Sequence, residues 1–233
     1  MAKKDLNETT DRRRFLGSLA TGAAAVSIAT LTPSLNLHAE ENAPFTGADD
    51  PAEKVFKNLK GKHRIVFDVT KPNGIMPFAW PRVFLMTNTA TGTPEKENNV
   101  VVILRHDGIP YAFDDSMWSK YNFGEMFEVM DDQKKPVTKN PFWKPAEGTY
   151  KVPGIGVVKI GINELQESGV QFVVCNAAMT VYSAVAAQKM NMKPEDVYKE
   201  WKSALLPGIT PVPSGVWAVG RAQEYKCGYC FAS

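Results

Sequence analysis

The chain has 233 residues, of which 44% are hydrophobic and 22% charged, and this length can build one large or two small hydrophobic cores. Residues 1–39 hold five of its 27 Lys/Arg and three of its 25 Asp/Glu, so residues 40–233 hold 22 of each and are formally neutral. A neutral domain has no basic excess to bind phosphates, which argues against nucleic acid and anionic membrane surfaces as partners.

The first residues carry the pattern of an export signal. Arg12 and Arg13 are followed by Phe15 and Leu16, and then by a weakly apolar stretch rich in Gly and Ala. Paired arginines ahead of a mildly hydrophobic segment are typical of twin-arginine signals. The alternative is an anchoring helix, but the Gly, Ser and Thr content argues against stable residence in a membrane. We therefore expect the twin-arginine translocation machinery to export the protein to the periplasm, with the signal peptide ending at Ala39.

The folded domain is expected over residues 61–233, because residues 40–60 are polar with scattered Ala, Gly and Pro and predict a linker. An apolar, β-branched run predicts a first strand at residues 63–69. A helix is predicted from Trp80, with Pro81 in its first turn and its end before Gly92. Residues 99–106 form a nearly uninterrupted apolar run, which is typical of a strand covered on both faces in a parallel sheet.

The middle of the chain is less regular. Acidic residues at 114 and 115 predict the start of a helix that runs to about residue 123. Residues 131–145 are too charged and proline-rich for a regular element and predict an exposed excursion. Its Phe142 and Trp143 could cover the edge of the core or form a subunit contact, and we expect a homo-oligomer. A capping-box pattern at Asn163 predicts a short helix that ends at Gly169.

A strand and a helix are predicted to meet at Cys175. The apolar run of residues 171–174 leads into this cysteine, and small, helix-compatible residues follow at once. Helix N-termini carry partial positive charge and unpaired N–H groups, so a thiol there is held nearer its reactive thiolate form. The alternative is that Cys175 is simply a buried small hydrophobic residue, as free cysteines often are.

The last third of the chain predicts helices after residue 176, from residue 194 and from residue 216, and strands within residues 205–215 and 225–232. Strands that alternate with helices predict an α/β fold: a single three-layer domain with a mainly parallel sheet of about five strands flanked by helices. Ligand sites in such folds lie beyond the carboxyl ends of the strands. The residues at such ends are Arg105, His106, Cys175 and Ser214.

Two residues after the second strand are the candidate neighbours of the Cys175 thiol. Arg105 or His106 could direct a charge or an imidazole ring into a crevice shared with Cys175, and thereby stabilise its thiolate. The alternative for His106 is a histidine that is merely hydrogen-bonded at the sheet edge.

The two cysteines near the C-terminus have the spacing of a redox pair. In an extended segment Cys227 and Cys230 would point to opposite faces, about 10 Å apart and beyond disulfide reach, but a turn at Gly228 would remove that obstacle. Because the expected compartment is oxidising, we expect at least one of them to form a disulfide, with the other or with Cys175. The alternatives are unpaired buried thiols, or a zinc or copper site built from the three cysteines and His106. We expect no metal and no cofactor.

Three stretches resemble the DsrE/DsrF-like family of small α/β sulfur-handling proteins, and the resemblance covers about residues 63–233. The stretches are Val100 to Gly108 with its Arg-His-Asp-Gly ending, Val173 to Met179, and Leu205-Leu206-Pro207-Gly208 with Val212-Pro213-Ser214-Gly215-Val216. The resemblance implies a DsrE-like fold and a persulfide carried on Cys175, and hence a sulfur-carrier or sulfurtransferase-like protein with a sulfur donor or acceptor as partner. The alternative is a non-catalytic periplasmic binding or assembly module that keeps the fold.

Overall fold

The computed structural model describes residues 50–233. Its centre is a five-stranded sheet in the order β6-β5-β2-β1-β7, in which every neighbouring pair is parallel. The strands are β1 (His63–Val69), β2 (Asn98–Leu104), β5 (Gln171–Cys175), β6 (Ile209–Val212) and β7 (Gly228–Phe231). The predicted α/β fold with a parallel sheet of about five strands is therefore confirmed.

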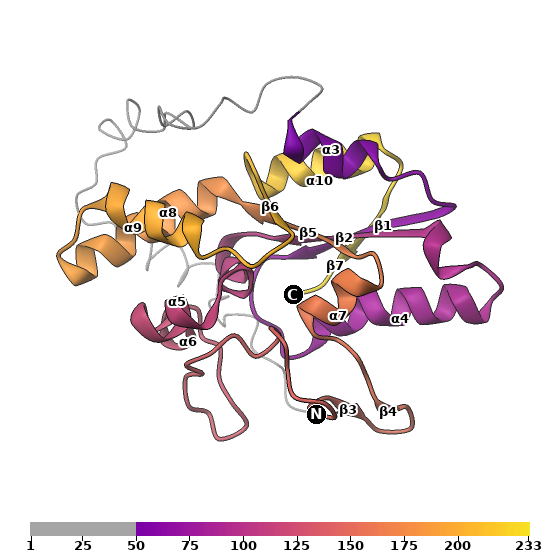
Figure 1. Cartoon of the computed structure of the whole chain (residues 1–233), viewed down its shortest axis with the longest axis horizontal. Coiled ribbons are helices and arrows are strands. Elements are labelled where there is room, and N and C mark those ends of the chain that lie inside the picture. The colour runs from indigo at the N-terminus through magenta and orange to yellow at the C-terminus, as the bar shows by residue number, and fades with distance from the viewer. Residues whose placement is uncertain (1–49) are drawn as a thin grey trace, which may run out of the picture. The chain divides into compact units, whose positions relative to one another are not determined.

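Helices cover both faces of this sheet (Figure 1). One face carries α3 (Pro51–Lys57) and α10 (Gly215–Glu224). The opposite face carries α4 (Met76–Ala90) and α7 (Ile162–Glu167). The larger core on that second side also includes residues of α5 (Asp115–Lys120), α6 (Phe123–Met126), α8 (Asn176–Met190), α9 (Pro194–Ser203) and the 3₁₀ helix η2 (His106–Ala112). The remaining elements are the 3₁₀ helix η1 (Glu95–Glu97) and a hairpin of β3 (Lys151–Val152) and β4 (Gly156–Val157).

The central strand β2 is apolar on both faces for a structural reason. Its Val101 and Ile103 pack into the core under α3 and α10, whereas Val100, Val102 and Leu104 pack into the larger core on the other side. A strand with helices on both faces has no solvent-facing side, so its sequence shows no alternation of polar and apolar residues. Within residues 50–233, none of the helices is long and apolar enough to cross a membrane.

The predicted linker is wrong between residues 51 and 57, where the chain forms α3. The side chain of Asp50 caps this helix by accepting a hydrogen bond of 2.7 Å from the N–H of Ala52. Phe56 is fully buried and meets the Trp217 ring edge-on, with the ring centroids 5.8 Å apart. The folded domain therefore includes α3 and starts earlier than the predicted residue 61. The predicted signal peptide and the rest of the predicted linker lie outside the described residues.

Two predicted helices have different limits in the structure. Helix α4 begins at Met76, so Pro77 rather than Pro81 occupies its first turn, and Pro81 lies inside the helix. The helix predicted over residues 115–123 is instead two short helices, α5 and α6. Asn122 separates them because its φ of +50° is left-handed and cannot continue a right-handed helix.

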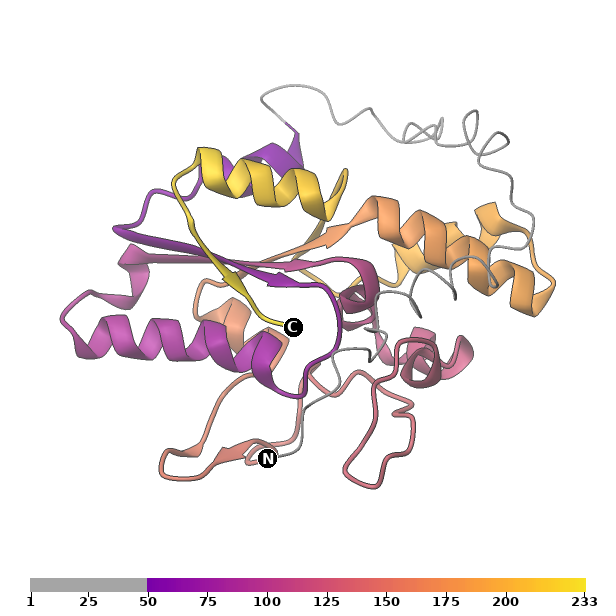
Figure 2. The same ribbon diagram turned by 180° about the vertical axis from the view of Figure 1, so that it is seen from behind.

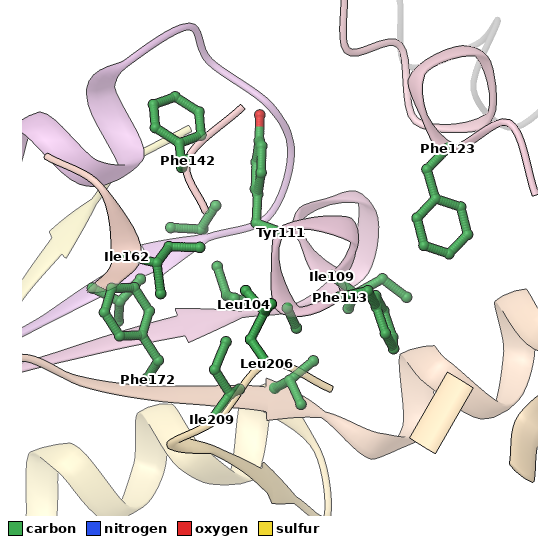
Figure 3. Close-up of a cluster of buried hydrophobic side chains, with 14 of the residues drawn as sticks. Leu104, Ile109, Tyr111, Phe113, Phe123, Phe142, Ile162, Phe172, Leu206 and Ile209 are labelled. Carbon is green, nitrogen blue, oxygen red and sulfur yellow. The ribbon is translucent and has the colours of Figure 1, made fainter. Parts of the chain in front are cut away.

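The excursion at residues 131–145 covers the edge of the larger core, the first of its two predicted roles. Phe142 is buried and stacks on Phe78, with the ring centroids 4.1 Å apart. The Asn140 side-chain amide fixes this loop by donating to the backbone carbonyls of Tyr111 and Phe113, each at 2.9 Å. Figure 3 shows Phe142 beside Tyr111 within this aromatic cluster.

Candidate functional site

Cys175 occupies the predicted boundary between strand and helix. It is the last residue of β5 and the N-cap of α8, and its Sγ accepts a hydrogen bond of 3.3 Å from the N–H of Ala178. The residue is only 6% exposed, and its side chain contacts the larger core. A shallow groove lined by Val170, Phe172 and Gly208 lies at the other end of β5, so it is not an entrance to this thiol.

A second helix begins beside Cys175. Ser214 caps α10, and its Oγ accepts a hydrogen bond of 3.1 Å from the N–H of Trp217. Cys175 is paired with Val212 in the sheet, and the N–H of Ala177 donates to the carbonyl of Pro213 at 3.2 Å. Two helix N-termini therefore lie together at the carboxyl ends of β5 and β6. Both present partial positive charge to this end of the two strands.

Arg105, which follows β2, is held by a buried carboxylate. Its Nε and Nη2 donate to the two oxygens of Asp68 at 2.7 and 2.8 Å, and the Tyr229 hydroxyl donates to the same carboxylate at 2.8 Å. Asp68 is 1% exposed, whereas the Arg105 side chain is 27% exposed. This bidentate pair fixes the plane of the guanidinium and turns its Nη1 edge away from Asp68.

The charge and position of Arg105 connect it to Cys175. The hydrogen bonds to Asp68 raise the pKa of Arg105 above its usual value against the desolvation of the guanidinium, and the charges of Asp68, Tyr229 and Cys175 act in the same direction. The stem of Arg105 lies against Gly215 at the start of α10, where an added Cβ would come within 2.5 Å of it. Leu104 of β2 pairs with Val174 of β5, so Arg105 and Cys175 are the next residues along two adjacent strands.

His106 contacts a different part of α8. Its backbone is left-handed, with φ = +51°, and its Nδ1 lies 3.0 Å from the Asp107 carboxylate, which also accepts a hydrogen bond from the Tyr182 hydroxyl. The His106 and Tyr182 rings meet edge-on, with centroids 6.0 Å apart. Tyr182 is about two helical turns, or roughly 10 Å, beyond Cys175 along α8. His106 is therefore part of an Asp-Tyr cluster beside the second turn of that helix.

The same cluster gives a pH-dependent contribution to stability. The hydrogen bond with Asp107 raises the pKa of His106, against desolvation and the charge of Arg105. Burial would raise the pKa of Asp107, but the hydrogen bonds from His106 and Tyr182 outweigh it and lower that pKa. The stability that protonated His106 contributes is full below its unfolded pKa of about 6.5 and is lost as pH rises through its folded pKa. The stability that ionised Asp107 contributes is full above its unfolded pKa of about 3.9 and is lost as pH falls through its folded pKa.

His106→Asn should therefore cost stability mainly between about pH 4 and pH 6.5, since Asn tolerates the left-handed backbone but carries no charge. The side chains of His106 and Asp107 are 50% and 37% exposed, so the cost should stay below about 1 kcal/mol. Urea unfolding of both proteins at pH 5.5 and pH 8 measures it. A difference of equal size at the two pH values would contradict the assignment.

The structure does not contain the disulfide expected at Cys227 or Cys230. All three cysteines are free thiols. Residues 228–231 form the extended strand β7 rather than a turn, so Cys227 packs into the core under α10 while Cys230 contacts the core on the opposite face. Cys175 lies on β5, three strand spacings or about 14 Å from β7, which is beyond disulfide reach. Burial raises the pKa of both the Cys227 and the Cys230 thiol.

The alternative of a zinc or copper site is not supported by the positions of the three cysteines and His106. Within residues 50–233, no group of three or more His, Cys, Asp or Glu side chains is placed to hold a metal ion. The three cysteines lie apart on β5 and around β7, and His106 is bonded to Asp107.

Three residues of this site were not predicted from the sequence: Asp68, Gly215 and Tyr229. Of these, Asp68 offered a sequence signal, because it is a lone carboxylate within an apolar, β-branched strand. A charge in such a strand is costly unless it is paired, so it points to a partner elsewhere in the chain.

No protein-family model matches this chain, and the comparison with curated proteins finds no match. Among solved structures, a protein of unknown function from Methanobacterium thermoautotrophicum is similar, with 16% sequence identity over 73% of this chain and 99% of that chain. The TM-score is 0.34, which is too low to support an argument about either protein.

Proposed function

We propose that the protein carries sulfane sulfur as a persulfide on Cys175. The observation that carries the proposal is the position of its Sγ, which accepts a hydrogen bond from the first turn of α8 at the end of β5, where Arg105 follows the adjacent strand β2. Helix N–H groups and a nearby cation both favour a sulfur atom that bears negative charge. The resemblance of residues 173–179 to sulfur-carrying members of the DsrE/DsrF-like family supports the same role.

The transfer step is redox-neutral. The Cys175 thiolate attacks the terminal sulfur of a donor persulfide, R–S–SH; the new Cys175 S–S bond forms as the donor S–S bond breaks, and the donor leaves as R–S⁻. The reverse attack by an acceptor thiolate on the terminal sulfur of Cys175 persulfide would pass the sulfur on. No cofactor is needed, because the leaving thiolate retains the electron pair of the broken bond.

Sulfur loading tests this function directly. The native protein is incubated with inorganic polysulfide, desalted and weighed intact by mass spectrometry, and it should gain the mass of one sulfur atom that is lost again on treatment with a reducing thiol. Cys175→Ser should lose this adduct while keeping its fold, because the change is nearly isosteric. Cys227→Ser and Cys230→Ser are matched controls that should retain it. An unloaded native protein, or an adduct that persists in Cys175→Ser, would rule the carrier out.

One observation favours a second candidate, a non-catalytic binding or assembly module. Cys175 is 6% exposed and acts as a helix cap, which a packed, unreactive thiol could also do. Alkylation by iodoacetamide separates the two functions. A carrier should be alkylated at Cys175 in the folded state, whereas a purely structural cysteine should react only after unfolding, at the rate of global opening.

We propose that the carrier acts in the periplasm after twin-arginine export. The support is the Arg12-Arg13 pair with Phe15 and Leu16 ahead of a Gly- and Ala-rich stretch. Those residues lie outside the described part of the chain.

A further inference from the structure

The two edges of the central sheet differ in their protection. At one edge, β6 carries Pro211 and packs beside α3. At the other edge, β7 has the sequence Gly-Tyr-Cys-Phe, with no charged residue and no proline. Soluble proteins usually protect sheet edges with such residues, because an open edge pairs with other strands. In Figure 2, β7 is the yellow strand between α10 and the C-terminus.

The backbone groups of β7 that point away from β1 belong to Tyr229 and Phe231. The N–H of Ala232 donates to the carbonyl of Asp68 on β1 at 3.0 Å, so Ala232 and Cys230, two residues earlier, direct their backbone groups toward β1. Alternate residues of a strand direct these groups to opposite sides. Tyr229 and Phe231 therefore present their N–H and C=O groups at the open edge, and their side chains are 49% and 52% exposed.

This edge is complementary to a copy of itself. If a second β7 lies antiparallel about a two-fold axis at Cys230, Tyr229 of each strand faces Phe231 of the other as a hydrogen-bonded pair, and the two aromatic pairs share one face. Cys230 then faces Cys230 of the second copy as a non-hydrogen-bonded pair, with Cα atoms about 4.5 Å apart, which is within disulfide reach. An unrelated extended peptide would match this edge only in its backbone, so the aromatic-Cys-aromatic symmetry favours a second copy.

We propose that two copies of this chain associate through antiparallel pairing of their β7 strands, centred on Cys230, to form one continuous ten-stranded sheet. The interface is an isologous one, as most dimers use. It lies beside the Asp68 carboxylate, because Tyr229 contributes both its backbone to the open edge and its hydroxyl to Asp68. The proposal does not depend on sulfur chemistry at Cys175.

Crosslinking at Cys230 tests the register. The full chain is treated with diamide at about pH 9, where more of this partly buried thiol is deprotonated than at neutral pH, because desolvation raises its pKa. Two Cys230 thiols then lose two protons and two electrons to one diamide, which is reduced to its hydrazine, and a single S–S bond forms. A non-reducing gel should show a covalent dimer for the native protein and for Cys227→Ser, and none for Cys230→Ser. Crosslinking that survives in Cys230→Ser, or its absence from the native protein, would overturn the proposal.

Sedimentation velocity without oxidant tests the interface independently of the thiol. The native protein and Cys230→Ser should both sediment as dimers at tens of micromolar chain. Phe231→Lys should be a monomer, because it replaces an aromatic residue of the pairing with a lysine, and a charged residue on an edge strand blocks strand pairing. The matched control is Val157→Lys, at an exposed valine of the β3-β4 hairpin, which should leave the dimer intact. A native monomer at these concentrations, or a dimer that Phe231→Lys does not weaken, would exclude this interface.

Discussion

Replacement of both Arg12 and Arg13 with Lys is expected to abolish export, leaving the chain in the cytoplasm at full precursor size. Lys keeps the positive charge but lacks the planar fork of hydrogen-bond donors that distinguishes a guanidinium. The prediction is thus that the signal is read by guanidinium geometry rather than by charge alone. Cell fractionation followed by immunoblotting measures the distribution, and the loss should be close to complete.

The control for that experiment changes charge and spares the arginine pair. Lys3→Ala with Lys4→Ala removes two positive charges upstream of the pair and should leave export nearly unchanged. Normal periplasmic accumulation of the double Lys variant would remove the basis for the proposed location. Equal loss of export in both double variants would indicate a general charge requirement instead.

The sheet was predictable because its sequence signals are local. Residues 63–69 were predicted as a strand and form β1, and the apolar run from residue 99 forms most of β2. The boundary at Cys175 was also local, since β-branched residues give way to small ones within a single step of the chain. Each of these patterns is decided by residues close in sequence, and tertiary packing reinforces it.

The errors arose where packing overrides a weak local pattern. The segment with α3 reads as polar, yet Ala52, Val55 and Phe56 are buried and dock this seven-residue helix on the same face of the sheet as α10. Pro81 reads as a helix start, but Pro77 already occupies the first turn and Pro81 is tolerated further in, where it is buried. Whether such a segment is helical, and where the helix begins, depends on the surface against which it packs. The sequence of the segment alone does not determine that surface.

The candidate site was predictable only in part because its contacts join distant segments. Cys175 and Arg105 were identified from their places at strand ends, but the residues that orient Arg105 come from β1, from β7 and from the first turn of α10. Strand order decides these neighbours: β1 lies between β2 and β7, which places Asp68 beside both Arg105 and Tyr229. No local pattern specifies that order.

Asp68→Ala is expected to give the largest loss of stability of any single change at the site. It removes the carboxylate that accepts two hydrogen bonds from Arg105 and one from Tyr229, and it leaves a partly buried guanidinium without its partner. Breaking a buried pair from one side costs about 3–5 kcal/mol, but Arg105 is 27% exposed and can turn partly to water, so we expect about 2–4 kcal/mol. Urea unfolding measures the change, and Asp132→Ala, at an exposed aspartate, should be close to neutral.

The coupling between Asp68 and Arg105 decides whether that loss comes from the ion pair. In Arg105→Ala the buried carboxylate loses its cation, which should again cost more than about 2 kcal/mol, whereas the double variant should cost less than the sum of the two single changes by about 1–3 kcal/mol. Tyr229→Phe removes one hydrogen bond and should cost only about 1 kcal/mol. Additive losses would show that the two side chains act independently. If Asp68→Ala fails to fold, Asp68→Asn keeps the side-chain volume and supports the same cycle, because an amide cannot neutralise the guanidinium charge.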